Sequence, residues 1–262
     1  MIAVDVAQLA FAQTIFGAAK AMRMRRHARP ARDGFMNFLS RTMDCHKILP
    51  ASFYHPKRML YRDLTERFSI KNPSLLKYLL KYMVGNMAQP ISMAKTFKDL
   101  KSQGYALSKN TVYDYVSYLE EAFMIFKVDI WHRSVRAQAL NPSKMYLIDP
   151  ALKYAMSIGE DRGRVLENAV FLHLRRQGLA PHYVQDKQEV DFFWENGQPV
   201  NVCLDFDTIA TREREIKGMT AALQTLDLPA GRILTRDRNE EIKTEDKTIF
   251  VQPAWSYFFE KS

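Results

Sequence analysis

Several features that define common protein classes are missing from this sequence of 262 residues. It contains only two cysteines, Cys45 and Cys203, which is too few for a disulfide framework and typical of a reducing cytoplasm, where we expect the protein. No uncharged apolar run reaches the roughly 18 residues that a membrane-spanning helix needs. We therefore expect no membrane association.

Motifs for three kinds of chemistry are also missing. There is no G-x-x-x-x-G-K-[ST] phosphate loop, whose glycine-rich turn aims backbone N–H groups at phosphates, so we expect no ATP site in this chain. The six histidines show no HxxxH or HxH spacing, which argues against a zinc site. No serine nucleophile elbow is present.

Acidic residues are scarce in the first half of the chain. Residues 1–132 contain 20 Lys+Arg and 10 Asp+Glu, whereas residues 133–262 contain 18 and 19. The formal net charge of +9 therefore comes from the N-terminal half. Such asymmetry favours DNA or another polyanion as a partner for that half. The alternative is an ordinary solvated basic surface.

Periodicity divides the chain into three segments. Residues 1–60 are broken by proline and glycine and predict an irregular or helical N-terminal remnant. In residues 61–150, apolar residues at helical spacing predict three helices with N-caps at Asn72, Ser92 and Ser108. Two strands, at about 124–131 and 143–148, follow with a basic loop between them.

Helix, short turn with glycine, helix, and a two-stranded wing is the outline of a winged helix. The third helix would then be the recognition helix, with its N-terminal end near base edges, while cations on the second helix and the wing contact phosphates. The alternative is a module of this shape that serves only protein packing. The predicted nucleic-acid-binding residues are Lys95, Lys98, Lys101, Lys109, Asn110, Tyr113, Arg133 and Arg136.

Residues 151–262 show a more regular alternation of elements. A helix at 162–177, strands at about 182–186, 189–194 and 199–206, a helix at 211–226 and strands at 232–235 and 248–251 are predicted. Asn196-Gly197 predicts a hairpin turn. The order α-β-β-β-α-β-β predicts a layered α/β (α+β) domain.

An acid on a helix, an acid on a strand and a polar pair on the next strand form the layout of a metal-dependent nuclease core. These positions are Glu167, Asp191, Asn201 and Cys203. Alternation places Glu189 and Asp191 on one side of their strand, and Asn201 and Cys203 on the same side of the next. Mg²⁺ held by Glu167 and Asp191 would sit where these sides meet.

The last polar pair weakens the catalytic interpretation. An active core would carry Glu-x-Lys there, whereas this chain carries Asn201 and Cys203. An asparagine is a poorer Mg²⁺ ligand than a carboxylate, and a cysteine does not replace a lysine that stabilises developing charge. Purely structural roles are the alternative: Glu167 as a helix-surface acid, Asp191 as a hydrogen-bond acceptor and Cys203 as a small buried apolar residue.

From about Tyr61 to Phe259, roughly three quarters of the chain, the sequence resembles the C-terminal half of predicted AAA-type ATPases of bacteria and archaea. That half ends in a conserved domain of unknown function. The matching motifs, in order, include Arg62-Asp63-Leu64, Lys71-Asn72, residues 108–111, 144–150 (KMYLIDP), 163–169 (GRVLENA), 189–192 (EVDF), 200–203 (VNVC), 211–215 (TRERE) and Pro253-Ala254-Trp255.

The resemblance implies a winged helix over residues 87–148 and a C-terminal PD-(D/E)XK nuclease-like fold. Glu167 and Asp191 fall on the acidic positions of that fold, and Asn201 and Cys203 fall on its Glu-x-Lys positions. The nucleotide-binding module that precedes this half in the family does not match residues 1–60. We therefore expect a truncated product, a remnant or a stand-alone form of the regulatory half.

Together, these observations predict a non-catalytic nucleic-acid- or partner-binding protein that does not hydrolyse ATP. Its parts would be a remnant at 1–60, a winged-helix-like domain at 61–150 and a degenerate nuclease-like domain at 151–262. No cofactor is expected, and Mg²⁺ at Glu167 and Asp191 is the one candidate. The alternatives are a Mg²⁺-dependent nuclease with a degenerate active site, and a protein-interaction module that binds a partner or self-associates.

Overall fold

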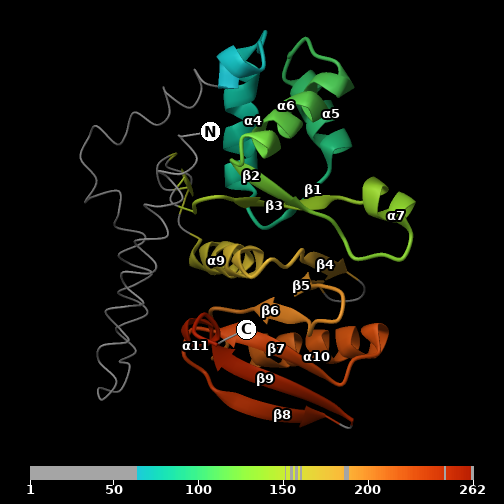
Figure 1. Cartoon of the computed structure of the whole chain (residues 1–262), viewed down its shortest axis with the longest axis vertical. Helices are drawn as coiled ribbons and strands as arrows, with labels where there is room; N and C mark the ends of the chain where they lie inside the picture. The colour runs from blue at the N-terminus through green and yellow to red at the C-terminus, as the bar shows by residue number, and fades with distance from the viewer. Residues whose placement is uncertain are drawn as a thin grey trace, which may run out of the picture. The chain divides into compact units, whose positions relative to one another are not determined.

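The computed structural model describes residues 64–150, 152–153, 156, 159, 161–185, 189–244 and 246–260 (Figure 1). All of them belong to one compact unit, Pro56–Ser262. The remnant predicted for residues 1–60 lies outside the described residues. The described part is a mixed α+β structure with two sheets, as the pattern of elements predicts. None of its helices is long and apolar enough to cross a membrane.

The first module, residues 73–147, combines helices with a small sheet. Its elements are α4 (Pro73–Gly85), β1 (Pro90–Ile91), α5 (Met93–Ser102), α6 (Lys109–Glu121), β2 (Ile125–Val128), α7 (Val135–Leu140) and β3 (Ser143–Leu147). The sheet has the order β1-β3-β2, and both pairs are antiparallel. Every residue of the central strand β3 is buried.

The three predicted N-caps of this module are confirmed. Asn72 Oδ1 accepts a hydrogen bond from Leu75 N–H at 3.0 Å, and Ser92 and Ser108 do the same for the amides three residues later. Each cap satisfies one of the N–H groups that a helix leaves unpaired at its start. On α4 the buried residues recur at helical spacing and form the core-facing side.

The loop predicted between the two strands of the wing contains a helix that the sequence pattern did not indicate. This helix, α7, begins after Ser134, whose Oγ accepts a hydrogen bond from Ala137 N–H. Alanine, glutamine and leucine, which follow, are good helix formers. The predicted strand at 124–131 is correspondingly shorter, since β2 ends at Val128.

The second module, residues 162–257, surrounds a six-stranded sheet of order β4-β5-β6-β7-β9-β8. Strands β6, β7 and β9 are parallel, and the remaining pairs are antiparallel. Its elements are α9 (Arg162–Arg176), β4 (His182–Gln185), β5 (Glu189–Phe193), β6 (Val200–Val202), α10 (Ile209–Leu226), β7 (Ala230–Thr235), β8 (Glu240–Thr244), β9 (Lys247–Pro253) and α11 (Ala254–Tyr257).

The predicted α-β-β-β-α-β-β order holds for this module, except that one strand and the short closing helix α11 were missed. That strand is β8, whose only apolar residue is Ile242 and which lies at the exposed edge of the sheet. Edge strands are often charged, so the hydrophobic pattern gives little sign of them. The predicted Asn196-Gly197 turn is confirmed: Asn196 has φ +62° and Gly197 N–H bonds to Trp194 O at 2.9 Å.

Strand β6 is shorter than predicted, because it ends at Val202 instead of reaching residue 206. Asp207, a few residues later, forms ion pairs with Arg236 and Arg238 at 3.0 and 2.6 Å. Thr208 then caps α10 by accepting a hydrogen bond from Thr211 N–H. These ion pairs and the helix cap hold the chain where it leaves the sheet and enters α10.

Candidate functional site

A fully buried lysine lies at the centre of the predicted acidic site. Lys144 belongs to β3, and its side chain has no solvent exposure. Its ammonium nitrogen contacts three carboxylate oxygens: Glu189 Oε1 at 2.7 Å, Asp191 Oδ1 at 2.8 Å and Glu167 Oε1 at 3.0 Å. These four residues, here called the Lys144 cluster, join β3 of the first module to α9 and β5 of the second.

Helix α9 holds β3 through two consecutive residues. Glu167 Oε1 accepts hydrogen bonds from Lys144 Nζ and from the Tyr146 hydroxyl, the latter at 2.7 Å. The amide of Asn168 accepts from Leu147 N–H at 2.7 Å and donates to Leu147 O at 2.9 Å. Figure 1 shows α9 between β3 and β6, and it contacts both strands. The Glu-Asn pair of the GRVLENA motif therefore docks the helix onto the first sheet.

Asp191 is held in place by β3 of the first sheet and by the adjacent strand β6 of its own sheet. Its Oδ1 accepts from Lys144, and its Oδ2 accepts from Val202 N–H at 2.9 Å. Asn201 lies beside it on β6, as alternation predicts, and its Oδ1 accepts from Asp191 N–H at 3.1 Å. The amide nitrogen of Asn201 donates to Glu215 on α10. Asn201 thus ties β5 to α10.

Cys203 follows directly after the end of β6. It is buried in an apolar cluster with residues such as Val190, Phe193 and Met219. Burial, aided by the nearby Glu215, raises the pKa of its thiol to about 12, so the thiolate that acts as a nucleophile or metal ligand is disfavoured. This agrees with the interpretation of Cys203 as a small apolar residue. Because β6 ends at Val202, the strand alternation from which its place beside the acids was predicted does not extend to Cys203.

The surroundings of the Lys144 cluster raise the pKa values of both Lys144 and Glu167. Burial is the largest influence on Lys144 and lowers its pKa, but the surrounding Asp191, Tyr146, Glu167 and Glu189 more than offset it and raise the pKa well above the usual range. Burial and the neighbouring Asp191 raise the pKa of Glu167 to about 8. At neutral pH the site therefore combines a charged lysine with a glutamic acid that tends to keep its proton.

The arrangement does not fit a divalent metal ion. The oxygens that would bind Mg²⁺ are directed at the Lys144 ammonium, and the second oxygen of Asp191 is engaged by Val202. Among the described residues, no group of three or more His, Cys, Asp or Glu side chains is placed to hold a metal. No catalytic step through a metal follows from this geometry.

The eight predicted nucleic-acid-binding residues all lie at the surface of the first module. Three are on α5, three are in the first turns of α6 and two flank the start of α7. Tyr113 is 45% exposed, and the ammonium of Lys109 lies 5.8 Å from the centre of its ring. Within the described part of the chain, none of the six cations in this set forms an ion pair.

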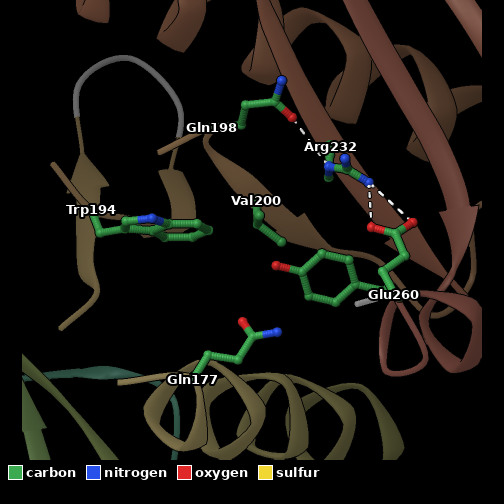
Figure 2. A pocket seen from close by; sticks show the side chains of 7 residues that line it. Gln177, Trp194, Gln198, Val200, Arg232 and Glu260 are labelled. Atoms are coloured by element: carbon green, nitrogen blue, oxygen red, sulfur yellow. Dashed lines mark hydrogen bonds and ion pairs between the residues drawn. The ribbon is translucent and has the colours of Figure 1, made fainter. Parts of the chain in front are cut away.

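A pocket of about 230 Å³ lies in the second module, away from both predicted sites (Figure 2). Arg232 is the one cation among its lining residues, and its guanidinium already bonds to Glu260 at 3.1 Å and to Gln198 at 3.1 Å. The charge of this arginine is therefore balanced within the pocket by Glu260. Its lining is Gln177, Trp194, Gln198, Val200, Arg232, Tyr257 and Glu260.

Sequence reasoning missed Lys144, Tyr146 and Asn168 as members of the site. The sequence did contain a signal for Lys144. It lies in a strand whose remaining residues are small or apolar enough to be buried, and a buried lysine needs carboxylate partners. Identifying those partners required the tertiary structure, since they lie 23 to 47 residues away. Glu189, which the sequence reasoning placed on the same side of the strand as Asp191 and considered as a substitute ligand, also belongs to the cluster.

Comparison with known proteins finds relatives whose roles are themselves uncharacterised. Residues 56–162 match the sequence model of a domain of unknown function, DUF8612. The chain is 32% identical over 212 residues to an uncharacterized protein of Methanocaldococcus jannaschii, covering 76% of this chain and 47% of the relative. It is 26% identical over 137 residues to an uncharacterized protein of Haemophilus influenzae, covering 51% of this chain and 34% of the relative.

The chain spans about half the length of the first relative and about a third of the second. No solved structure matches it. The DUF8612 match ends at residue 162, so it includes Lys144 and stops before Glu167, Glu189 and Asp191. The Lys144 cluster therefore links the matched domain to the residues that follow it.

Proposed function

We propose that this chain is a non-catalytic nucleic-acid-binding protein, in which α5, α6 and the α7 loop contact the phosphate backbone. The order helix, strand, helix, helix, strand, strand, with α7 inserted between the last two strands and a β1-β3-β2 sheet, supports a winged helix as the binding module. The α-β-β-β-α-β order after it supports a nuclease-like core that has lost its chemistry. Both would derive from the C-terminal half of an AAA-type ATPase.

One observation carries the proposal: the two modules differ in how many of their exposed cations form ion pairs with carboxylates. In the first module the six predicted contact cations are exposed and, among the described residues, have no carboxylate partner. In the second module six arginines form ion pairs with carboxylates, for example Arg212 with Glu240 at 2.9 Å and Arg238 with Asp207 at 2.6 Å. Phosphate groups are attracted to cations that the protein itself has not neutralised.

The charge surplus of the binding module itself is modest. Residues 64–132 contain nine Lys+Arg and six Asp+Glu, so most of the positive excess of the N-terminal half lies in residues 1–63. Affinity for DNA would therefore be weak at physiological salt and strongly dependent on ionic strength. A protein partner remains the competing proposal, and self-association is one form of it.

The test measures binding of a labelled 30-base-pair duplex to the full chain. Binding is monitored by fluorescence anisotropy across a salt series. The expected result is a steep loss of affinity with salt, further weakened in Lys98→Glu and Lys109→Glu. Lys217→Glu is the matched control, because Lys217 is equally exposed but lies on α10. Equal effects of all three substitutions, or no binding at low salt, would refute the proposal and leave partner binding.

A further inference from the structure

Helix α4 contains a short sequence repeat, since residues 75–82 read LLKYLLKY. Its four leucines are buried in the core, whereas Lys77 and Lys81 are exposed and Tyr78 and Tyr82 are partly exposed. Residues four apart lie one above the other on a helix, so the repeat places the two lysines in one row and the two tyrosines in the next. The side of α4 that faces away from the core is therefore both basic and aromatic.

The tyrosine rings on this side lie next to one another. The rings of Tyr78 and Tyr82 are nearly parallel, with an interplanar angle of 11° and centroids 6.4 Å apart. Tyr105, from the segment between α5 and α6, places a third ring 5.6 Å from that of Tyr78, and Gln103 Nε2 donates a hydrogen bond to the Tyr78 hydroxyl at 3.2 Å. A ring that is already held in place loses little conformational entropy when a ligand stacks on it. The α4 surface, as it is called here, consists of Lys77, Tyr78, Lys81, Tyr82 and Tyr105.

The positive charge of the α4 surface is not balanced on its own helix. Helix α4 contains two lysines and no aspartate or glutamate. Within the part of the chain that the structure describes, neither Lys77 nor Lys81 forms an ion pair. Such lysines attract a polyanion. A protein partner is less favoured, because lysine is depleted in the core of protein–protein interfaces.

We propose that the α4 surface binds single-stranded nucleic acid, with unpaired bases stacked on its tyrosines and phosphates held by its lysines. The bases of a duplex are stacked on one another, so a tyrosine on a helix surface reaches the face of a base only in an unpaired strand. Aromatic rings beside a positive track are the usual means of binding single strands without sequence preference. None of these five residues belongs to the set proposed to contact a duplex, so the proposal does not depend on duplex binding.

The test compares two labelled oligonucleotides bound to the full chain, monitored by fluorescence anisotropy at low salt. One is a single-stranded 15-mer of thymidine, and the other has the same backbone without bases. The wild type is expected to bind the thymidine strand at least about 5-fold more tightly, because stacking of one base on an aromatic ring changes affinity by a factor of about 5 to 150. Equal affinities would overturn the proposal, and this comparison requires no variant to fold.

Substitutions then locate the binding on α4. Tyr78→Ala should weaken binding of the thymidine strand by a factor of about 5 to 150 and leave binding of the abasic strand unchanged. Tyr78→Phe keeps the ring and should bind as the wild type does. Lys81→Glu should weaken binding of both strands and reduce its salt dependence, and Lys217→Glu, at an exposed position on α10, is its matched control.

Two results with the variants would overturn the proposal: a folded Tyr78→Ala that binds the thymidine strand as tightly as the wild type, or equal effects of Lys81→Glu and Lys217→Glu. Should circular dichroism show that Tyr78→Ala is unfolded, Lys81→Glu decides the location. Failure to bind the single strand at low salt would also overturn the proposal and leave a protein partner for the α4 surface. Duplex binding is tested separately with Lys98→Glu and Lys109→Glu, so failure of one proposal is distinguishable from failure of the other.

Discussion

Replacing Lys144 by methionine perturbs the Lys144 cluster with little change in side-chain volume. The substitution removes the ammonium and leaves Glu167 and Asp191 facing each other, each with only 11% of its side chain exposed. Removing one partner of a buried ion pair costs about 3–5 kcal/mol, because the remaining charge is uncompensated. Glu167 relieves part of this cost by holding a proton, so we expect a loss near 3 kcal/mol, towards the lower end of that range.

The assay is urea and thermal unfolding of the full chain at pH 7, monitored by circular dichroism. A loss of this size lowers Tm by roughly 6–12 °C, since about 1 kcal/mol corresponds to 2–4 °C for a unit of 150–250 residues. Lys243→Met is the control. Lys243 is 77% exposed on β8 and, among the residues that the structure describes, pairs with Glu241 alone, so its replacement should change stability by less than about 0.5 kcal/mol.

A double variant separates the cluster from a general effect of the substitution. Lys144→Met combined with Asp191→Asn removes one buried charge of each sign, so it should lose at least about 1 kcal/mol less than the sum of the two single losses. Additive losses would show that the two side chains are not coupled. A loss below about 1 kcal/mol for Lys144→Met alone would refute the reasoning, because a buried, triply paired ammonium must matter more than that.

Three further predictions concern pH, docking and catalysis. The pKa of Glu167 is about 8 in the folded protein against an ordinary 4.5, so its stabilising contribution is complete below pH 4.5 and is lost as pH rises through 8. The free energy of unfolding should therefore fall between pH 5 and pH 8 with a slope of up to about 1.4 kcal/mol per pH unit. Glu167→Gln should flatten this pH dependence. Asn168→Ala leaves both backbone groups of Leu147 without their partner and should cost about 2–4 kcal/mol in urea unfolding, whereas the exposed Asn110→Ala should cost under about 0.5 kcal/mol. Supercoiled plasmid should not be nicked with Mg²⁺ or Mn²⁺, and nicking that disappears in Asp191→Ala would contradict the non-catalytic proposal.

The sequence by itself determined the features that depend on a few neighbouring residues. The caps at Asn72, Ser92 and Ser108 were predictable because a cap bonds an amide only three residues away. The pairing of Asp191 with Asn201 across a hairpin was predictable because side chains alternate with period two and the turn fixes the register. Helix α7 was missed because its six residues include no buried position that would mark a core-facing side, and strand β8 was missed because its sequence is almost entirely polar.

Only the tertiary structure decided what the acidic positions do. The sequence pattern places Glu167 and Asp191 on converging elements, and Mg²⁺ was the one cation that it offered as a candidate there. The fold instead inserts Lys144, which is 23 and 47 residues distant along the chain and belongs to the other module. Because an ion pair between distant segments exists only once the two sheets are docked, no local pattern specifies it. Docking therefore decides which cation the cluster holds.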